Sequence, residues 1–219
     1  MKNKIFKFIL LFVFCFVFLN ANGQEQFNFD VTEIQILDDG NKFVGKQRGK
    51  ISSDNGLVIN ANEFEYIKSL NLLTAYGNIE ILDTINNYKI YTDKITYEKN
   101  NDKIYTQNGS RALDLFGGIE IIAEEFNYDI SKNVITAKKN AIINNTVKNY
   151  TISSKLILNL KKENKIFTKG KTSAILNSKY NFKSSDVTFL INEKKLFSKN
   201  EAIVTDKSNF YKLENFVYF

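Results

Sequence analysis

The sequence predicts an all-β protein built from repeated hairpins, and three observations carry this prediction. The 219 residues include 19 Phe and 11 Tyr and no Pro, a composition that favours strands. Apolar residues recur at every second position, as expected for strands with one buried face. These alternating segments return about every 30 residues, which is the pattern of a repeat architecture.

Residues 1–23 are predicted to be a secretory signal peptide, which leaves residues 24–219 as the folded domain. Three lysines precede an unbroken apolar run at 8–19, and small residues follow at Ala21 and Gly23. A membrane-spanning helix needs about 20 apolar residues, so this run is short for one. Cleavage after Gly23 fits best, and an uncleaved anchor is the alternative.

Each repeat contains an apolar residue followed two positions later by another apolar residue. The first members of these pairs are separated by 30, 31, 31, 30, 31 and 29 residues. The pairs are Ile34/Ile36, Phe64/Tyr66, Ile95/Tyr97, Phe126/Tyr128, Leu156/Leu158, Val187/Phe189 and Phe216/Tyr218. A polar, turn-prone stretch follows most pairs, so each unit reads as a hairpin. Six units and part of a seventh fill the domain without a linker.

A bend is predicted within each long strand. The alternation changes parity before several of the pairs, for example between Ala61 and Phe64. Such a shift turns every later side chain to the other face unless a bulge or a bend absorbs it. Residues that tolerate positive φ recur 13 or 14 positions after the start of each pair. They are Gly77, Asn108-Gly109, Asn140, Gly170 and Asn200.

The composition argues against most enzyme classes and against a dedicated nucleic-acid binder. The chain has no His, and its only cysteine, Cys15, lies in the apolar run. A mature chain without Cys or His lacks the usual nucleophile pairs and zinc, haem or iron–sulfur ligands, so we expect no cofactor, metal or catalytic site. Glu124 and Glu125 are adjacent, and on a strand they point to opposite faces. The formal charge of +6 falls to +3 without the three signal-peptide lysines and is spread thinly, so no nucleic-acid partner is expected.

Two segments resemble the repeat of the OstA-like domain family. One is Asn60–Tyr66 with Leu73–Ile79, and the other is Ile122–Tyr128 with Ile135–Ala137. The resemblance covers residues 27–219. The family occurs in lipopolysaccharide transport proteins, namely the periplasmic bridge protein LptA and the N-terminal domain of the outer-membrane assembly protein LptD. The opening stretch, residues 27–34, is more similar to the latter.

The resemblance implies an elongated, twisted β-jellyroll that is open along one side. Acyl chains of lipopolysaccharide would lie in its apolar interior, and the module would join a periplasmic LptA-type bridge protein edge to edge. The chain stops at the start of a repeat, so we expect a natural product that continues into an outer-membrane barrel with its plug lipoprotein. That product would lie on the periplasmic side of the outer membrane. Known assembly proteins link this domain to the barrel through cysteines, which the mature chain lacks.

The repeat positions give the expected lipid-binding residues. The groove lining comprises Ile34, Ile36, Phe64, Tyr66, Ile95, Tyr97, Phe126, Tyr128, Leu156, Leu158, Val187 and Phe189. The edge that meets the bridge protein comprises Phe27, Phe29 and Val31. Three alternatives stay open: a free-standing bridge protein, a structural β-repeat surface protein without a ligand, and, for any single lining residue, an ordinary closed core.

Overall fold

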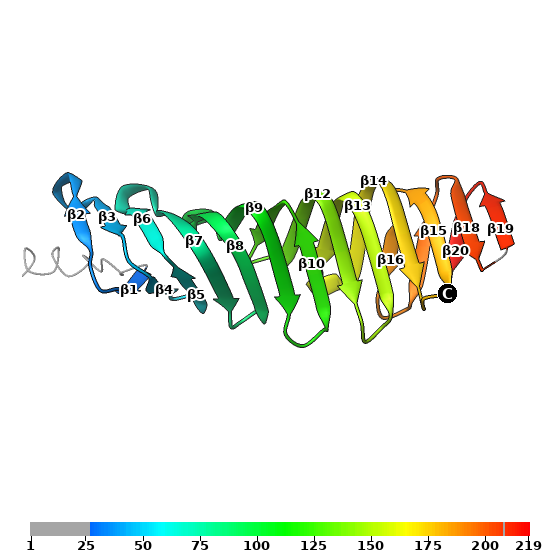
Figure 1. Cartoon of the computed structure of the whole chain (residues 1–219), viewed down its shortest axis with the longest axis horizontal. Helices are drawn as coiled ribbons and strands as arrows, with labels where there is room; N and C mark the ends of the chain where they lie inside the picture. The colour runs from blue at the N-terminus through cyan, green and yellow to red at the C-terminus, as the bar shows by residue number, and fades with distance from the viewer. Residues whose placement is uncertain (1–26, 208) are drawn as a thin grey trace, which may run out of the picture.

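The computed structural model describes residues 27–207 and 209–219; the predicted signal peptide lies outside them. This part of the chain forms one twenty-stranded antiparallel sheet with four short 3-10 turns (Figure 1). The all-β fold class is therefore confirmed. No helix in the described ranges is long and apolar enough to cross a membrane.

The strands and 3-10 turns have the following bounds. The strands are β1 (Phe27–Asp30), β2 (Gln35–Leu37), β3 (Lys42–Gly45), β4 (Gly49–Ser53), β5 (Leu57–Ala61), β6 (Glu63–Ile67), β7 (Leu72–Asp83), β8 (Tyr88–Glu98), β9 (Lys103–Asp114), β10 (Ile119–Ala123), β11 (Glu125–Asp129), β12 (Val134–Asn145), β13 (Tyr150–Leu160), β14 (Lys165–Leu176), β15 (Tyr180–Ser185), β16 (Thr188–Leu190), β17 (Lys195–Ser198), β18 (Ala202–Asp206), β19 (Asn209–Leu213) and β20 (Phe216–Tyr218). The turns are η1 (Asp38–Gly40), η2 (Lys68–Leu70), η3 (Lys99–Asn101) and η4 (Lys161–Glu163).

The chain meanders, because each long strand pairs with the strands before and after it. β7 pairs with β8 and β8 with β9, and the same order runs from β12 through β13 to β14. Where a long strand is divided in two, both halves pair with the same neighbour, as β5 and β6 do with β7. One repeat of about 31 residues is thus two long strands, and successive repeats lie side by side along the long axis (Figure 1).

Each long strand bends near its middle, which confirms the bend inferred from the parity shift. The register slips at this point in all four pairings of full-length strands, for example between Tyr76 and Ile79 on β7. The backbone has positive φ at Gly77, Asn108, Gly109, Asn140 and Gly170. A Cβ on Gly77 would lie 2.9 Å from the Asn62 amide nitrogen, so both conformation and space favour glycine there. Asn200 is not among the positive-φ residues.

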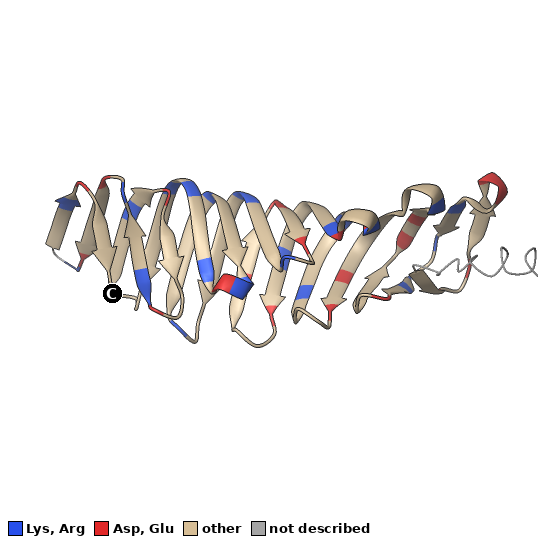
Figure 2. Ribbon diagram, turned by 180° about the vertical axis from the view of Figure 1, so that it is seen from behind, with Lys and Arg blue, Asp and Glu red and all other residues tan. Residues whose placement is uncertain are grey.

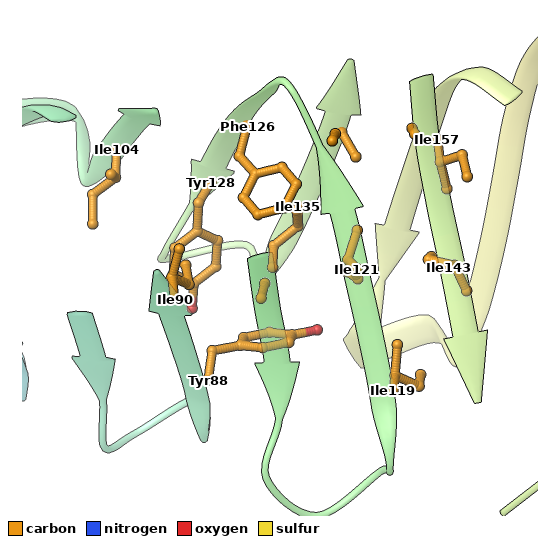
Figure 3. Close-up of a cluster of buried hydrophobic side chains, with 14 of the residues drawn as sticks. Tyr88, Ile90, Ile104, Ile119, Ile121, Phe126, Tyr128, Ile135, Ile143 and Ile157 are labelled. Carbon is orange, nitrogen blue, oxygen red and sulfur yellow. The ribbon is translucent and has the colours of Figure 1, made fainter. Parts of the chain in front are cut away.

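The bends divide the sheet into two arms that face each other. Arm I carries the 3-10 turns and consists of β2, β3, β6, β11, β16, β17, β20 and the adjoining halves of the long strands. Arm II consists of β1, β4, β5, β10, β15, β18, β19 and the other halves. The hydrophobic core lies between the arms, where side chains from both point toward one another (Figure 3).

The turns of arm I are connected to one another by backbone hydrogen bonds. The amide of Lys68 donates to the carbonyl of Asn41 at 2.8 Å, and that of Lys99 donates to Asn71 at 3.1 Å. The same bond recurs from Ile130 to Asp102, from Lys161 to Asn133 and from Ile191 to Asn164. The turn row therefore continues the sheet pairing beyond the ends of the strands.

Candidate functional site

Most of the predicted lining residues point into the space between the arms and are buried there. Those with buried side chains are Phe64, Tyr66, Ile95, Tyr97, Phe126, Tyr128, Val187 and Phe189. Figure 3 shows Phe126 and Tyr128 of β11 directed toward Ile135 and Tyr88 from neighbouring strands. Most of these side chains are under 5 % exposed, so in this structure they pack against each other as a closed core. Their role in lipid binding stays a prediction.

Three of the predicted lining residues are not buried in the interior. Ile36 lies on edge strand β2 opposite Phe43 and shares its inward face, but it is 59 % exposed at the open end of the sheet. Leu156 and Leu158 of β13 are only half-buried and point outward. The inward positions of that arm are Ile157 and Asn159 instead.

With Ile157 in place of Leu156, the inward positions recur at a constant spacing. From Phe64 through Ile95 and Phe126 to Ile157 the spacing is 31 residues at every step. β13 bends at Lys155, between buried Ser154 and buried Ile157, as β8 bends between Thr92 and Ile95. Ile34, at the start of the series, is half-buried and packs against the edge of the core.

The predicted partner edge is an edge of the sheet, but its aromatic side chains turn inward. β1 pairs only with β4 among the described strands, so its other backbone side is unpaired. Phe27 is buried, and Phe29 stacks on Phe43 and Phe64 at centroid distances of 6.0 and 5.5 Å. Val31 fits against Gly49, where a Cβ would lie 2.4 Å from the valine methyl carbon. These side chains close the N-terminal end of the core, and one backbone side of β1 is unpaired among the described strands.

The C-terminal end also combines an aromatic cluster with open strand edges. Phe182 stacks on Phe216 at 5.4 Å, and Tyr180 contacts Tyr218 at 5.5 Å. β19 and β20 each pair with one strand only in the described chain. Apolar side chains are exposed on or beside these two strands. They are Phe210, Tyr211, Leu213, Val217 and Phe219.

The two rows of turns meet along a seam that closes the side of the core opposite the bends. At its centre the Lys161 ammonium of η4 donates to the Asp114 carboxylate at 2.9 Å and to the Asn86 carbonyl at 2.7 Å. It also lies 4.4 Å from the centre of the Tyr88 ring. The Asp114 side chain is 3 % exposed, so this ion pair is shielded from water and joins arm I to arm II.

Further contacts continue the seam toward the N-terminus. The Asn86 amide donates to the Ile130 carbonyl at 3.0 Å. The Asn55 amide donates to Asp102 at 3.0 Å and to the Tyr97 hydroxyl at 2.9 Å. Lys99 binds Asp54, and this hydrogen bond lowers the pKa of the Asp54 carboxyl. The seam is thus held by polar contacts, without a covalent link.

Buried tyrosines extend this polar network into the core. The Tyr128 hydroxyl donates to the Asp83 carboxylate at 2.6 Å, and the Asn159 amide donates to the Tyr88 hydroxyl at 2.7 Å. Burial raises the pKa of both hydroxyls far above the ordinary tyrosine value, and the nearby carboxylates raise it further. A cavity of about 280 Å³ beside Asp114, Asn159 and Lys161 opens onto the seam.

The seam was not predicted from the sequence, although some of its residues recur periodically. Asp83, Asp114 and Asn145 end β7, β9 and β12, every second strand of the meander, at a spacing of 31 residues, and each is buried. Each accepts hydrogen bonds from backbone amides of the turn that follows, as Asp83 does from Asn86 at 2.7 Å. A polar side chain that accepts hydrogen bonds from the turn after it is a motif that can be recognised in a sequence. The partner Lys161 has no such local signal.

No group of three or more His, Cys, Asp or Glu side chains that could hold a metal ion occurs in the part of the chain described here. The adjacent Glu124 and Glu125 are engaged separately. Glu124 accepts a hydrogen bond from Asn140 at 2.8 Å, and Glu125 pairs with Lys139. They form no convergent carboxylate pair.

Comparisons with known proteins give likeness to solved structures only. No protein-family profile matches the sequence, and no curated protein matches it. Among solved structures, the chain is similar to the crystal structure of LptH, described as the LptA homologous periplasmic component of the conserved lipopolysaccharide transport device from Pseudomonas aeruginosa. The identity is 12 % and the TM-score 0.47, over 52 % of this chain and 82 % of that chain. A likeness of this size does not assign a function.

Proposed function

We propose that the chain is a lipid-transport module that carries lipopolysaccharide acyl chains between its two arms on the periplasmic side of the outer membrane. The observation that carries the proposal is the core, which is apolar along almost the whole molecule and is closed on one side only by polar contacts between turns. One buried CH₂ group contributes about 0.8 kcal/mol, so a twelve-carbon acyl chain needs roughly 9–10 kcal/mol of shielding in water. A long apolar interior supplies that shielding without any chemistry.

Loading requires the seam to open. The contacts across it are hydrogen bonds and ion pairs, which water can replace one at a time. Opening exposes the apolar side chains that now pack on each other, and acyl chains then replace those contacts. The bends on the opposite side act as the hinge, with backbone already in positive φ at Gly77 and Gly109.

The strand edges support a role in a larger assembly. β1 and β2 at one end, and β19 and β20 at the other, each leave one backbone side unpaired among the described residues. Unpaired strands accept a further strand from a partner. We propose that one end docks an LptA-type bridge protein by strand addition. In the assembly-protein form of the proposal, the other end faces an outer-membrane barrel and its plug lipoprotein; the alternative is a free-standing bridge protein.

Photo-crosslinking tests the interior as the lipid site. A benzoylphenylalanine at Phe126 or Tyr97 keeps an aromatic ring in place and should capture lipopolysaccharide in cells. The same probe at exposed Lys132 should not. Capture only at Lys132 contradicts the proposal. A probe at exposed Asn28 on β1 should capture the bridge protein, which tests the edge separately.

A locked seam provides the sharper test. Asn55 and Asp102 touch across the seam, and the only native cysteine, Cys15, lies in the predicted signal peptide. In a chain with Asn55→Cys and Asp102→Cys, a short bismaleimide bridge should abolish lipid capture at Phe126. Each single variant treated in the same way should keep it. Unchanged capture in the bridged chain means that lipid does not enter by the seam.

A structural β-repeat protein without a ligand is the second candidate. The closed interior favours it, because the buried side chains already pack on one another without a ligand. It predicts no lipid capture at Phe126 or Tyr97, while partner capture at Asn28 remains.

A further inference from the structure

A large cavity lies outside the core, on the outer face of arm II. It measures about 1030 Å³ and runs along the bends of β12 to β15 and onto β18 and β19. Neither the sequence repeat nor the seam accounts for it. We call it the outer groove and define its central row by the paired residues Ile142, Ser153, Ser173, Lys183, Ile203 and Lys212.

Small side chains create the groove. Ser153 and Ser173 sit side by side on β13 and β14, with Ile142 on one flank and Ile203 two strands away on the other. Neighbouring strands are about 4.8 Å apart, so the six-strand row spans roughly 24 Å. Both isoleucines are more than a third exposed, which leaves apolar surface uncovered along the floor.

The same row is filled elsewhere in the molecule. Toward the N-terminus it continues through Ile122 and Arg111 to Tyr91 and Glu80 on successive strands. There Arg111 forms an ion pair with Glu120 across the strands, and Tyr91 lies beneath the Lys89 ammonium. Large side chains occupy the row where the groove is absent. The groove is therefore specific to β12–β19 and is not a general feature of the repeat.

The lining of the groove is basic. Five lysines line it, Lys139, Lys155, Lys171, Lys183 and Lys212, against two acids, Glu124 and Glu201. Lys139 pairs with Glu125, and Lys212 lies 3.8 Å from Glu201. Within the described ranges, no carboxylate forms an ion pair with Lys155, Lys171 or Lys183. Figure 2 shows blue segments repeated along the edge where these strands bend.

We propose that the outer groove is a second ligand site, which binds an anionic amphiphile with a phosphate headgroup. An apolar floor beside unpaired cations suits a molecule with an alkyl chain and a charged end. The alkyl chain lies on Ile142 and Ile203 across the two serines. The phosphate meets Lys155, Lys171 and Lys183. This site goes beyond the proposed carriage of lipid in the core and does not depend on it.

Titration calorimetry with dodecyl phosphate, below its micelle concentration, tests the site on the purified chain. Binding should weaken about tenfold in Lys171→Glu and in Lys183→Glu. Ser173→Phe, which fills the floor, should remove it. The control is Lys46→Glu, an exposed lysine near the N-terminal end, and it should bind as the parent does. Thermal unfolding of each variant separates a lost site from a lost fold.

Two other probes decide the chemistry of the ligand. Sodium phosphate should bind far more weakly than dodecyl phosphate, and equal binding would make the site a simple anion site. Dodecyl maltoside, which is neutral, should also bind weakly; equal binding would make the lysines irrelevant. Either equality overturns the proposal, as does parent-like binding by all three groove variants.

The bridged Asn55→Cys, Asp102→Cys chain separates the outer groove from the core. Dodecyl phosphate should bind it as tightly as it binds the unbridged chain, because the groove lies outside the seam. Binding that disappears on bridging would place the ligand in the core. That result would overturn the outer groove while leaving the proposed function intact.

Discussion

The middle of the molecule and its two ends are closed by different means. In the middle, β7 to β9 and β12 to β14 are 11 or 12 residues long, and the seam is held by the Lys161–Asp114 pair and buried hydrogen bonds. At the ends the strands are 3 to 6 residues long, and clusters of Phe and Tyr rings fill the space between the arms. Buried polar groups depend on their particular partners, whereas the rings at the ends contribute mainly buried apolar area. The polar pairs that close the middle would have to separate for the proposed loading of lipid, whereas the ends combine apolar packing with unpaired strand edges.

Alkaline pH should destabilise the middle of the molecule more than its ends. Tyr88, Tyr97 and Tyr128 lie on β8 and β11, and burial raises the pKa of all three in the folded state. Their contribution to stability is fully present below pH 10, the unfolded value. It is lost as pH rises above 10, because only the unfolded chain then releases the protons. At pH 11 the loss is about 1.4 kcal/mol per tyrosine, or roughly 4 kcal/mol together.

Chemical denaturation at pH 8 and pH 11 measures this loss. The variant Tyr128→Phe should lose about 1.4 kcal/mol less stability between these two pH values than the parent. An equal loss in parent and variant would mean that the Tyr128 hydroxyl does not contribute to the pH dependence of stability.

Truncation of a central core side chain should have the next largest effect. Ile143 on β12 is 0 % exposed and lies in the cluster of Figure 3. Ile143→Ala should reduce the free energy of unfolding by about 3.5 kcal/mol, through lost transfer energy and an unfilled cavity. Ile175→Ala on the outer face, where the side chain is 43 % exposed, should cost less than about 1 kcal/mol. Equal losses would mean that the core is not closed around Ile143.

Removal of the central seam cation tests the polar closure directly. Lys161→Met should cost about 3 kcal/mol, because it leaves the Asp114 carboxylate buried without its counter-charge. Adding Asp114→Asn should recover part of the loss, since the amide oxygen still accepts hydrogen bonds from the backbone amides of Phe116 and Gly117. A double-mutant cycle in denaturant measures the coupling. Additive losses would show that the two side chains do not stabilise the seam together.

Substitution at an open edge should have the smallest effect on stability. Phe210 on β19 is 66 % exposed, so Phe210→Ser should change the free energy of unfolding by less than about 0.5 kcal/mol. The same change should reduce self-association or partner binding through β19, measured by sedimentation velocity. A large loss of stability would show that Phe210 belongs to the C-terminal aromatic cluster.

The sequence was sufficient to predict the repeated strands and their bends, but not the contacts that close the two arms along the seam. The 31-residue spacing, the bends and the inward positions on β6, β8 and β11 follow from local patterns of apolar residues and glycine, which report the face of each strand. On β13 the pattern misled, because the inward position holds polar Asn159 and the outward ones hold Leu156 and Leu158. A prediction that turns the apolar side chains inward therefore assigns Leu156 and Leu158 to the wrong face of β13.

The state of the interior could not be predicted for a different reason. The pattern says which side chains face inward but not how far apart the facing arms lie. The seam joins residues distant in sequence, such as Lys161 with Asp114, 47 positions apart. The outer groove depends on serines at two neighbouring strand positions, which have no meaning until the register is known.

The hydrogen-bonded ladder of turns makes the length of the molecule adjustable. Each turn of arm I forms a hydrogen bond to the turn before it through the same backbone groups. Every unit therefore offers the next unit the same hydrogen-bonding surface to which it is itself bonded. A chain that gained or lost one unit of 31 residues would rejoin this ladder in register. Its length would change by two strand spacings, about 10 Å, while the packing of the other units stayed as it was. The length of the fold therefore increases in proportion to the number of its units.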